Sequence, residues 1–285
     1  MRKLAGAAWT MRFTGRALLP FLALWATLTL PACTQDPEEK LAAAQARDAL
    51  ANGYFLEAEK GWEDYIRTYP RGRSRLEAWN RLVDMSELRG DAEKSADIME
   101  AMLLEYAQEP EVRRATALRL AALYNRLDRG DLALDLWRGV LGSKDLPSEK
   151  RSEIQLLMAK TSRDRGAAEA SVQLLRECVK NAQAPGTRAL CLYDLAQGLT
   201  LDQRFPAAME AIEEVRRMRE APEHIRIQAT FLLAEIHELD RNTKKARELY
   251  ESIRGLYPNR EVVEYRLRNL GQDRGKAEPT PEPAQ

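Results

Sequence analysis

Small side chains recur along this 285-residue sequence with a period of 37 or 38 residues. One series of small or short apolar residues consists of Ala46, Val83, Ala121, Ala159, Ala196 and Ala234. A second series, twelve positions further on, consists of Ala58, Ser95, Ala133, Ser171, Ala208 and Ala246. Because both series keep one period, they indicate a structural unit that is repeated six times. Two helices that cross closely need small side chains at the crossing point. Each unit is therefore predicted to be a pair of packed helices.

Bulky apolar residues and prolines follow the same period. Four residues after the second small position stand Trp62, Met99, Trp137, Leu175, Ile212 and Tyr250, and seven residues after it stand Tyr65, Met102, Val140, Cys178, Val215 and Ile253. Each unit closes at or just before a proline, namely Pro70, Pro110, Pro147, Pro185, Pro222 or Pro258. Proline cannot continue a helix, so it separates one hairpin from the next. The sequence predicts an all-α chain of six helical hairpins.

These residues resemble the tetratricopeptide repeat (TPR). The pattern of a Leu-small pair, an aromatic, a small residue and a closing proline is similar to "LAALY…LALDLW…P" and to "NGYFLEA…YP". The longer period and the "YP" endings look like the periplasmic TPR proteins of the BamD and YbgF types. The resemblance implies a right-handed superhelix over residues 38–271, with "REVVEYRLRNLG" as its capping helix. The Pro-rich residues 272–285 are expected to form a disordered tail.

The N-terminal segment has the composition of a secretion signal. Four basic residues and no acidic ones precede the apolar run "ALLPFLALWATLTL", which is too short to span a bilayer comfortably. The run ends in "LPAC", which resembles a bacterial lipobox, so residues 1–32 are predicted to be removed and Cys33 to be lipidated, with residues 33–37 as a tether. The alternative is an ordinary signal peptide with an incidental cysteine. Translation can start at Met1 or Met11. Thr34 in place of Asp favours the outer membrane.

The sequence offers little that supports catalysis. Its two histidines, His224 and His237, lack the spacing of a helical zinc pair, and no phosphate-binding, dinucleotide-binding or nucleophile-elbow motif occurs. We therefore predict no enzymatic activity, no cofactor, no metal site and no small-molecule substrate. Without residues 1–32 the chain has 40 basic and 44 acidic side chains, a balance that does not favour nucleic-acid binding.

A stack of hairpins leaves a concave face lined by the first helix of each unit. The repeat places the following candidate partner-binding residues there: Asn80, Asp84, Leu118, Arg126, Lys160, Arg163, Tyr193, Gln197, Phe231 and Glu235. Tyr193 and Phe231 occupy equivalent positions. They are either exposed aromatic anchors, typical of binding hot spots, or core residues. Ala43 and Ala122 stand where the peptide-carboxylate clamp of some TPR proteins needs polar donors, which disfavours that mode of binding.

These observations predict a membrane-anchored, non-catalytic periplasmic scaffold. It would bind a protein or peptide partner during cell-envelope assembly, of the outer-membrane-protein or secretin type. The alternative is an adaptor that recruits or regulates a peptidoglycan hydrolase or a protease.

Two further cysteines, Cys178 and Cys191, flank Pro185 in neighbouring helices at nearly the same predicted height. An oxidising periplasm permits a disulfide between them if their Cα atoms are about 4.4–6.8 Å apart. The alternative is two free thiols that fill small apolar spaces.

We predict that Cys33 carries fatty acid. Metabolic labelling with an alkyne fatty acid should mark the wild type, because the thiol of the lipobox cysteine is the acylated group. Cys33→Ser should remain unlabelled and accumulate as a precursor, and labelling that persists in this variant would contradict the prediction.

Overall fold

The computed structural model describes residues 36–270, and these residues form thirteen helices and no strand. The helices are α1 (Pro37–Ala51), α2 (Phe55–Thr68), α3 (Arg75–Leu88), α4 (Ala92–Glu105), α5 (Pro110–Arg126), α6 (Gly130–Leu141), α7 (Ser148–Asp164), α8 (Ala168–Asn181), α9 (Pro185–Leu201), α10 (Phe205–Arg217), α11 (Glu223–Leu239), α12 (Thr243–Ile253) and α13 (Arg260–Asn269). The prediction of six hairpins followed by one further helix is confirmed. The predicted signal peptide, Cys33 and the C-terminal tail lie outside the described residues.

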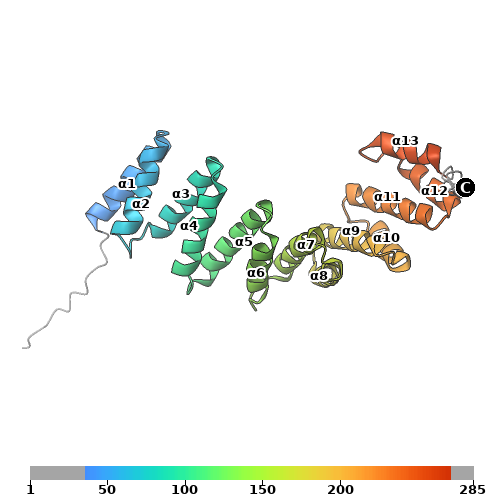
Figure 1. Cartoon of the computed structure of the whole chain (residues 1–285), viewed down its shortest axis with the longest axis horizontal. Helices are drawn as coiled ribbons and strands as arrows, with labels where there is room; N and C mark the ends of the chain where they lie inside the picture. Colours follow the sequence, from blue (N-terminus) through green and yellow to red (C-terminus); the bar gives the residue numbers. More distant parts are fainter. Residues whose placement is uncertain (1–35, 271–285) are drawn as a thin grey trace, which may run out of the picture.

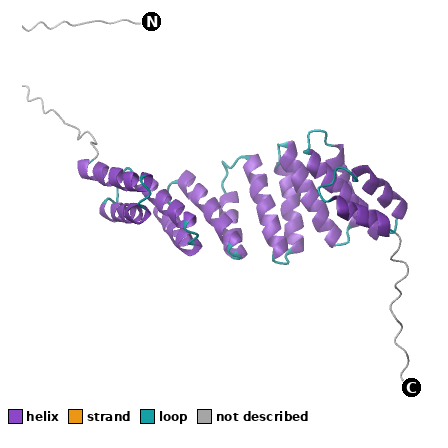
Figure 2. Cartoon of the chain, turned by 90° about the horizontal axis from the view of Figure 1, so that it is seen from above, coloured by secondary structure: helices purple, strands orange, loops and turns teal. Residues whose placement is uncertain are grey.

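The hairpins follow one another along a curved array, from α1 at one end to α13 at the other (Figures 1 and 2). Each helix packs against its neighbours in the sequence. In addition, first helices of consecutive units approach each other, α7 with α9 and α9 with α11, more closely than any second helices in residues 36–270. The first helices therefore form the inner side of the curve, and the second helices form the outer side.

The two small-residue series lie in the core, as close packing of the paired helices requires. All twelve of these residues are buried, with at most 2% of the surface of any one exposed. In unit one the approach is so close that a Cβ added at Gly61 would lie 3.1 Å from the Cβ of Ala46. The bulky residues of the two other series are also buried. The period in the sequence is thus the period of the core.

Every first helix ends in the same kind of turn. A residue with positive φ follows each one, at Gly53, Gly90, Asp128, Gly166, Gln203 and Arg241, again at intervals of 37 or 38 residues. One residue later, a backbone N–H donates to the carbonyl five positions back, as from Tyr54 N to Ala49 O at 2.9 Å. This hydrogen bond is that of a Schellman motif, which satisfies a carbonyl at the end of the helix. The repeated turn fixes where each second helix begins.

Arginines recur in the first turn of the first helices, and three of them, Arg75, Arg151 and Arg188, bind carbonyls of the preceding unit. The recurring arginines stand at equivalent positions, Arg75, Arg113, Arg151, Arg188 and Arg226. The Nη1 atom of Arg151 donates to Leu141 O at 2.7 Å, at the end of α6. Arg188 donates in the same way to Val179 O in the last turn of α8, at 2.8 Å. Carbonyls at the C-terminal end of a helix carry partial negative charge and lack partners within the helix, so these bonds join the end of one hairpin to the start of the next.

The turns between first and second helices carry a second set of links between units. Glu59 of α2 is buried and accepts hydrogen bonds from Arg89 and Lys94 of unit two, each with an N···O distance of 2.6 Å. The hydrogen bond from Arg89, with a smaller contribution from Lys94, lowers the pKa of the Glu59 carboxyl to about 2, against the opposing effect of burial. Arg129 pairs with Glu93 at 2.7 Å between units two and three. Polar contacts on this edge therefore support the apolar packing.

The described N-terminal end of the array is adapted to solvent. Gln45 of α1 is exposed, whereas the equivalent positions in the next five units are buried and hold Leu82, Leu120, Met158, Leu195 and Leu233. In those units the side chain is covered because another hairpin precedes it. A polar residue in the first described unit agrees with the requirement that the ends of a repeat array have polar outer faces.

A disulfide joins α8 to α9 between units four and five. The Cα atoms of Cys178 and Cys191 are 5.8 Å apart, both residues are fully buried, and Ala182 packs beside them. The two cysteines thus meet at the hairpin junction, at the common height that the repeat predicts.

We expect this bond in protein isolated without reducing agent. Without reduction, alkylation of the unfolded chain should leave Cys178 and Cys191 unmodified, and prior reduction should make both reactive, as mass analysis can show. Cys178→Ala should free Cys191 for alkylation and lower the free energy of unfolding by about 3 kcal/mol at most, because the bond closes a short loop. Alkylation of both cysteines before reduction would contradict the expectation.

Candidate partner-binding face

The first helices carry all the candidate partner-binding residues on the inner side of the array. Asn80 and Asp84 lie on α3, Leu118 and Arg126 on α5, Lys160 and Arg163 on α7, Tyr193 and Gln197 on α9, and Phe231 and Glu235 on α11. The structure does not bring them into one cluster. They form three local groups, over units two and three, over units four and five, and over unit six with α13.

The group over units two and three combines an ion-pair network with a cavity. Arg119 of α5 pairs with Asp84 at 2.8 Å and with Glu87 at 2.6 Å, so the charge of Asp84 is neutralised across the junction. Asn80 is exposed, and its Nδ2 donates to Leu76 O at 2.8 Å. Beside Asn80, residues of α3, α4 and α5 line a cavity of about 490 Å³ that opens to solvent.

The group over units four and five contains a buried carboxylate. Asp194 of α9 is only 5% exposed, and its Oδ2 lies 3.6 Å from Lys160 Nζ, close enough for an ion pair but too far for a hydrogen bond. Burial raises the pKa of Asp194, while the charges of Lys160 and Arg163 oppose this shift. Lys160 itself is exposed. The arrangement presents a cationic group to solvent above a buried anion that holds it in place.

Tyr193 lies half-buried next to Asp194. Its hydroxyl oxygen accepts a hydrogen bond from Gln197 Nε2 at 3.0 Å, one helical turn further along α9. Burial raises the pKa of Tyr193 to about 12, with additional contributions from Tyr257, Asp194 and Glu235. The phenol therefore stays protonated at neutral pH and can donate a hydrogen bond to an acceptor on a partner.

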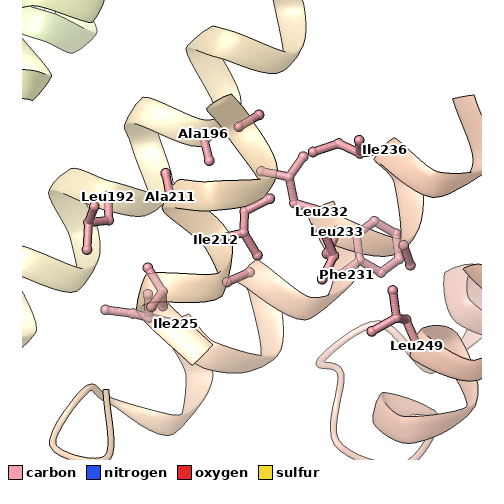
Figure 3. Packing of buried hydrophobic residues seen from close by; sticks show 14 of the residues in the cluster. Leu192, Ala196, Ala211, Ile212, Ile225, Phe231, Leu232, Leu233, Ile236 and Leu249 are labelled. Carbon is pink, nitrogen blue, oxygen red and sulfur yellow. The ribbon is translucent and has the colours of Figure 1, made fainter. Parts of the chain in front are cut away.

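Phe231 is a core residue, so the idea of two exposed aromatic anchors is wrong for this position. It is 8% exposed, and Figure 3 shows it within the apolar cluster near Leu249 of α12. Its ring stacks on Tyr257 with centroids 4.4 Å apart and meets the ring of Tyr250 edge-on at 5.4 Å. The physical reason is the residue before the closing proline, which in unit six is Tyr257, whose ring stacks on Phe231, but in unit five is the small Ala221.

Glu235 lies in a network with α13. Its Oε1 is 2.9 Å from Arg266 Nη2, and Arg266 also lies 3.6 Å from Glu238. Burial raises the pKa of Glu235, and the Arg266 charge acts against this shift. Because Arg266 of α13 contacts both carboxylates, the network attaches α13 to the inner side of α11.

Several contributors to this face were missed by the sequence reasoning. Asp194, Arg119, Tyr257 and Arg266 each contact a predicted residue, but none was predicted. The positions equivalent to Asp194 in units two, three, four and six hold Arg81, Arg119, Leu157 and Leu232. These residues share neither charge nor polarity, so the repeat gave no signal at this position. By contrast, the arginines at Arg75 and its equivalent positions recur every 37 or 38 residues, so this period could have identified them from the sequence.

Among residues 36–270, no group of three or more His, Cys, Asp or Glu side chains could hold a metal ion. In the same part of the chain, no helix has the length and apolar character needed to cross a membrane.

We predict that Phe231 and Tyr193 differ in their effect on stability. Phe231→Ala should lower the free energy of unfolding by about 3–5 kcal/mol, because it removes a buried ring. Tyr193→Phe, which removes only the hydroxyl, should cost about 1 kcal/mol. Urea unfolding followed by circular dichroism measures both, and equal losses for the two variants would contradict the assignment of Phe231 to the core and of Tyr193 to the face.

Comparison with known proteins relates the chain to TPR structures by fold. No family model matches the sequence, and no curated protein matches it. The crystal structure of PilW, a widely conserved type IV pilus biogenesis factor, is similar with a TM-score of 0.52 and 15% identity, over 81% of this chain and 99% of PilW. PilF of Pseudomonas aeruginosa gives a TM-score of 0.51 at 10% identity, over 80% of this chain and 95% of PilF.

A variant of a Podosopora anserina putative kinesin light chain with nearly identical TPR-like repeats gives a TM-score of 0.51 at 21% identity. The similarity covers 69% of this chain and 97% of that one. These likenesses, together with the thirteen helices of residues 36–270 and the repeated core, show that the chain has an all-α, TPR-like solenoid fold.

Proposed function

We propose that the chain is a non-catalytic, lipid-anchored scaffold that binds a protein partner on its inner face during assembly of the bacterial cell envelope. One observation carries this proposal. The first helices of units four and five hold an exposed Lys160 and a partly exposed Arg163, Tyr193 and Gln197 near the buried Asp194.

The chemistry of this group fits protein binding. Tyr193 is an amphipathic ring with a hydroxyl proton to donate, and aromatic and arginine side chains are the residues that most often dominate binding interfaces. Lys160 is exposed but restrained by Asp194, which reduces the entropy lost when it meets an acceptor. The group therefore supplies both apolar contact and hydrogen-bond donors on a rigid helical support.

The envelope context rests on two further lines of support. The lipobox-like "LPAC" before Thr34 predicts a lipid on Cys33, and several acyl chains together hold a protein at a membrane stably. PilW, which has a similar fold, is a type IV pilus biogenesis factor. Fold alone does not transfer a function, so this similarity supports the class of role and not a particular partner. The resemblance of the sequence to the BamD and YbgF types likewise supports the class of role and not a particular partner.

Crosslinking in intact bacteria tests the proposal. The full lipid-anchored chain should give a reproducible crosslinked partner in the membrane fraction. The triple variant Lys160→Ala, Arg163→Ala, Gln197→Ala should reduce the yield of this product at least about tenfold, which corresponds to about 1.4 kcal/mol of binding free energy.

A matched control removes three exposed polar side chains from the outer side of the array, with Arg138→Ala, Gln173→Ala and Lys180→Ala on α6 and α8. It should keep the wild-type yield. If both triple variants crosslink like the wild type, the inner face of units four and five is not the binding surface.

A further inference from the structure

The cavity between units two and three has the character of a binding pocket. Its volume is about 490 Å³, within the range of ligand pockets in proteins. Its base consists of Met99 and Met102 of α4, with Val83 of α3 beside them, and all three are buried. Asn80 and Arg119 stand at its mouth on the inner face. We infer that this cavity receives an uncharged apolar side chain, of leucine or aromatic size, from the protein partner.

The other units show what belongs in this space. At the position of Asn80, the next four units have Leu118, Leu156, Tyr193 and Phe231, side chains that pack against the core clusters. Thr116, on the opposite wall, is replaced by Ile154 one unit later, and Met99 is replaced by Trp137. The side chain that this space lacks is therefore the one at position 80, because units three to six all have bulk there, whereas unit one, at the described end of the array, has Ala43. A leucine or an aromatic ring from outside would restore the packing found in units three to six.

The charges at the mouth favour a neutral occupant. Arg119 is already paired with Asp84 and Glu87, at 2.8 and 2.6 Å, and Glu111 is paired with Arg114. A charged side chain would have to break one of these pairs or enter the cavity without a partner, and burying an unpaired charge is costly. An apolar side chain demands neither. The flexible thioethers of Met99 and Met102 can adapt to its shape.

Asn80 adds a polar contact at the edge of the cavity. Its Nδ2 donates to Leu76 O, and its Oδ1 accepts no hydrogen bond from the described chain. This oxygen is therefore available to a main-chain N–H of the segment that carries the apolar side chain. The cavity opens on the same inner face as Lys160 and Tyr193, so this inference rests on the proposed function and adds an anchor point to it.

Methionine-methyl NMR on the mature chain, residues 33–285 with Cys33→Ser so that no lipid is attached, tests the pocket. The probes are N-acetyl-leucinamide and N-acetyl-phenylalaninamide, with N-acetyl-lysinamide as the charged control. The methyl signals of Met99 and Met102 should shift saturably with the two apolar amides and not with the lysine amide. No membrane and no partner is needed, so failure here would reject the pocket without rejecting the scaffold.

Two variants fill the cavity from opposite walls with residues that the next unit already uses, Asn80→Leu and Thr116→Ile. Each should raise the apparent dissociation constant for the apolar amides at least about tenfold, and the second decides the outcome if the first does not fold. Gln173→Leu, which adds a leucine on the exposed surface of α8, should bind like the wild type.

Three results would overturn the inference. The first is the absence of shifts at Met99 and Met102 up to the solubility limit of the amides. The second is unchanged binding in a folded cavity-filling variant. The third is a change in these two signals when the protein alone is diluted, which would show that a second copy of the chain occupies the cavity.

Discussion

The close crossing of two helices at small side chains is the constraint on which the rest of this structure depends. In unit one Ala46 approaches Gly61 closely, and in every unit the two buried small residues leave room for the bulky residues around them to pack and exclude water. Larger residues there would force the hairpin apart, because packed interiors do not absorb extra volume without strain. One short hairpin buries too little apolar surface to be stable alone. Each unit therefore needs its neighbour, and the array is stable only as a stack.

Stacking also determines where the chain is free to vary. Carbonyl contacts from Arg151 and Arg188 fix the start of a hairpin on the end of the one before, and the Cys178–Cys191 bond reinforces one such junction. These contacts lie at helix ends and in the seams between units, away from the inner surface of the first helices. Side chains on that surface are therefore under less packing constraint, and they differ from unit to unit. Variable chemistry on a regular support is the arrangement expected of a binding surface.

The sequence predicted the fold well because the period of the small residues reports the core directly. It was much less informative about the face. Phe231 and Tyr193 share a register position, but Phe231 stacks on Tyr257, a turn residue 26 positions after it, and the residue before the closing proline of unit five is Ala221. Asp194 stands in a column without common chemistry, and its importance lies in its burial beneath Lys160. The burial of Phe231 and of Asp194 depends on contacts with residues at other positions of the repeat. The pattern of residues at a single repeat position therefore does not reveal it.

Departures from the repeat are for this reason more informative about binding than the repeat itself. Two departures can be compared. Gln45 replaces a buried leucine or methionine at the described end of the array, where no described hairpin precedes it, and its exposure to solvent explains the change. Asn80 lies in the interior of the array, where hairpins lie on both sides, at a position that holds leucine or an aromatic residue in units three to six and Ala43 in unit one, and a cavity adjoins it over two buried methionines. A cavity of this kind reduces packing energy without any benefit to the fold. Solvent at an open end cannot account for it, and a side chain supplied by a partner can.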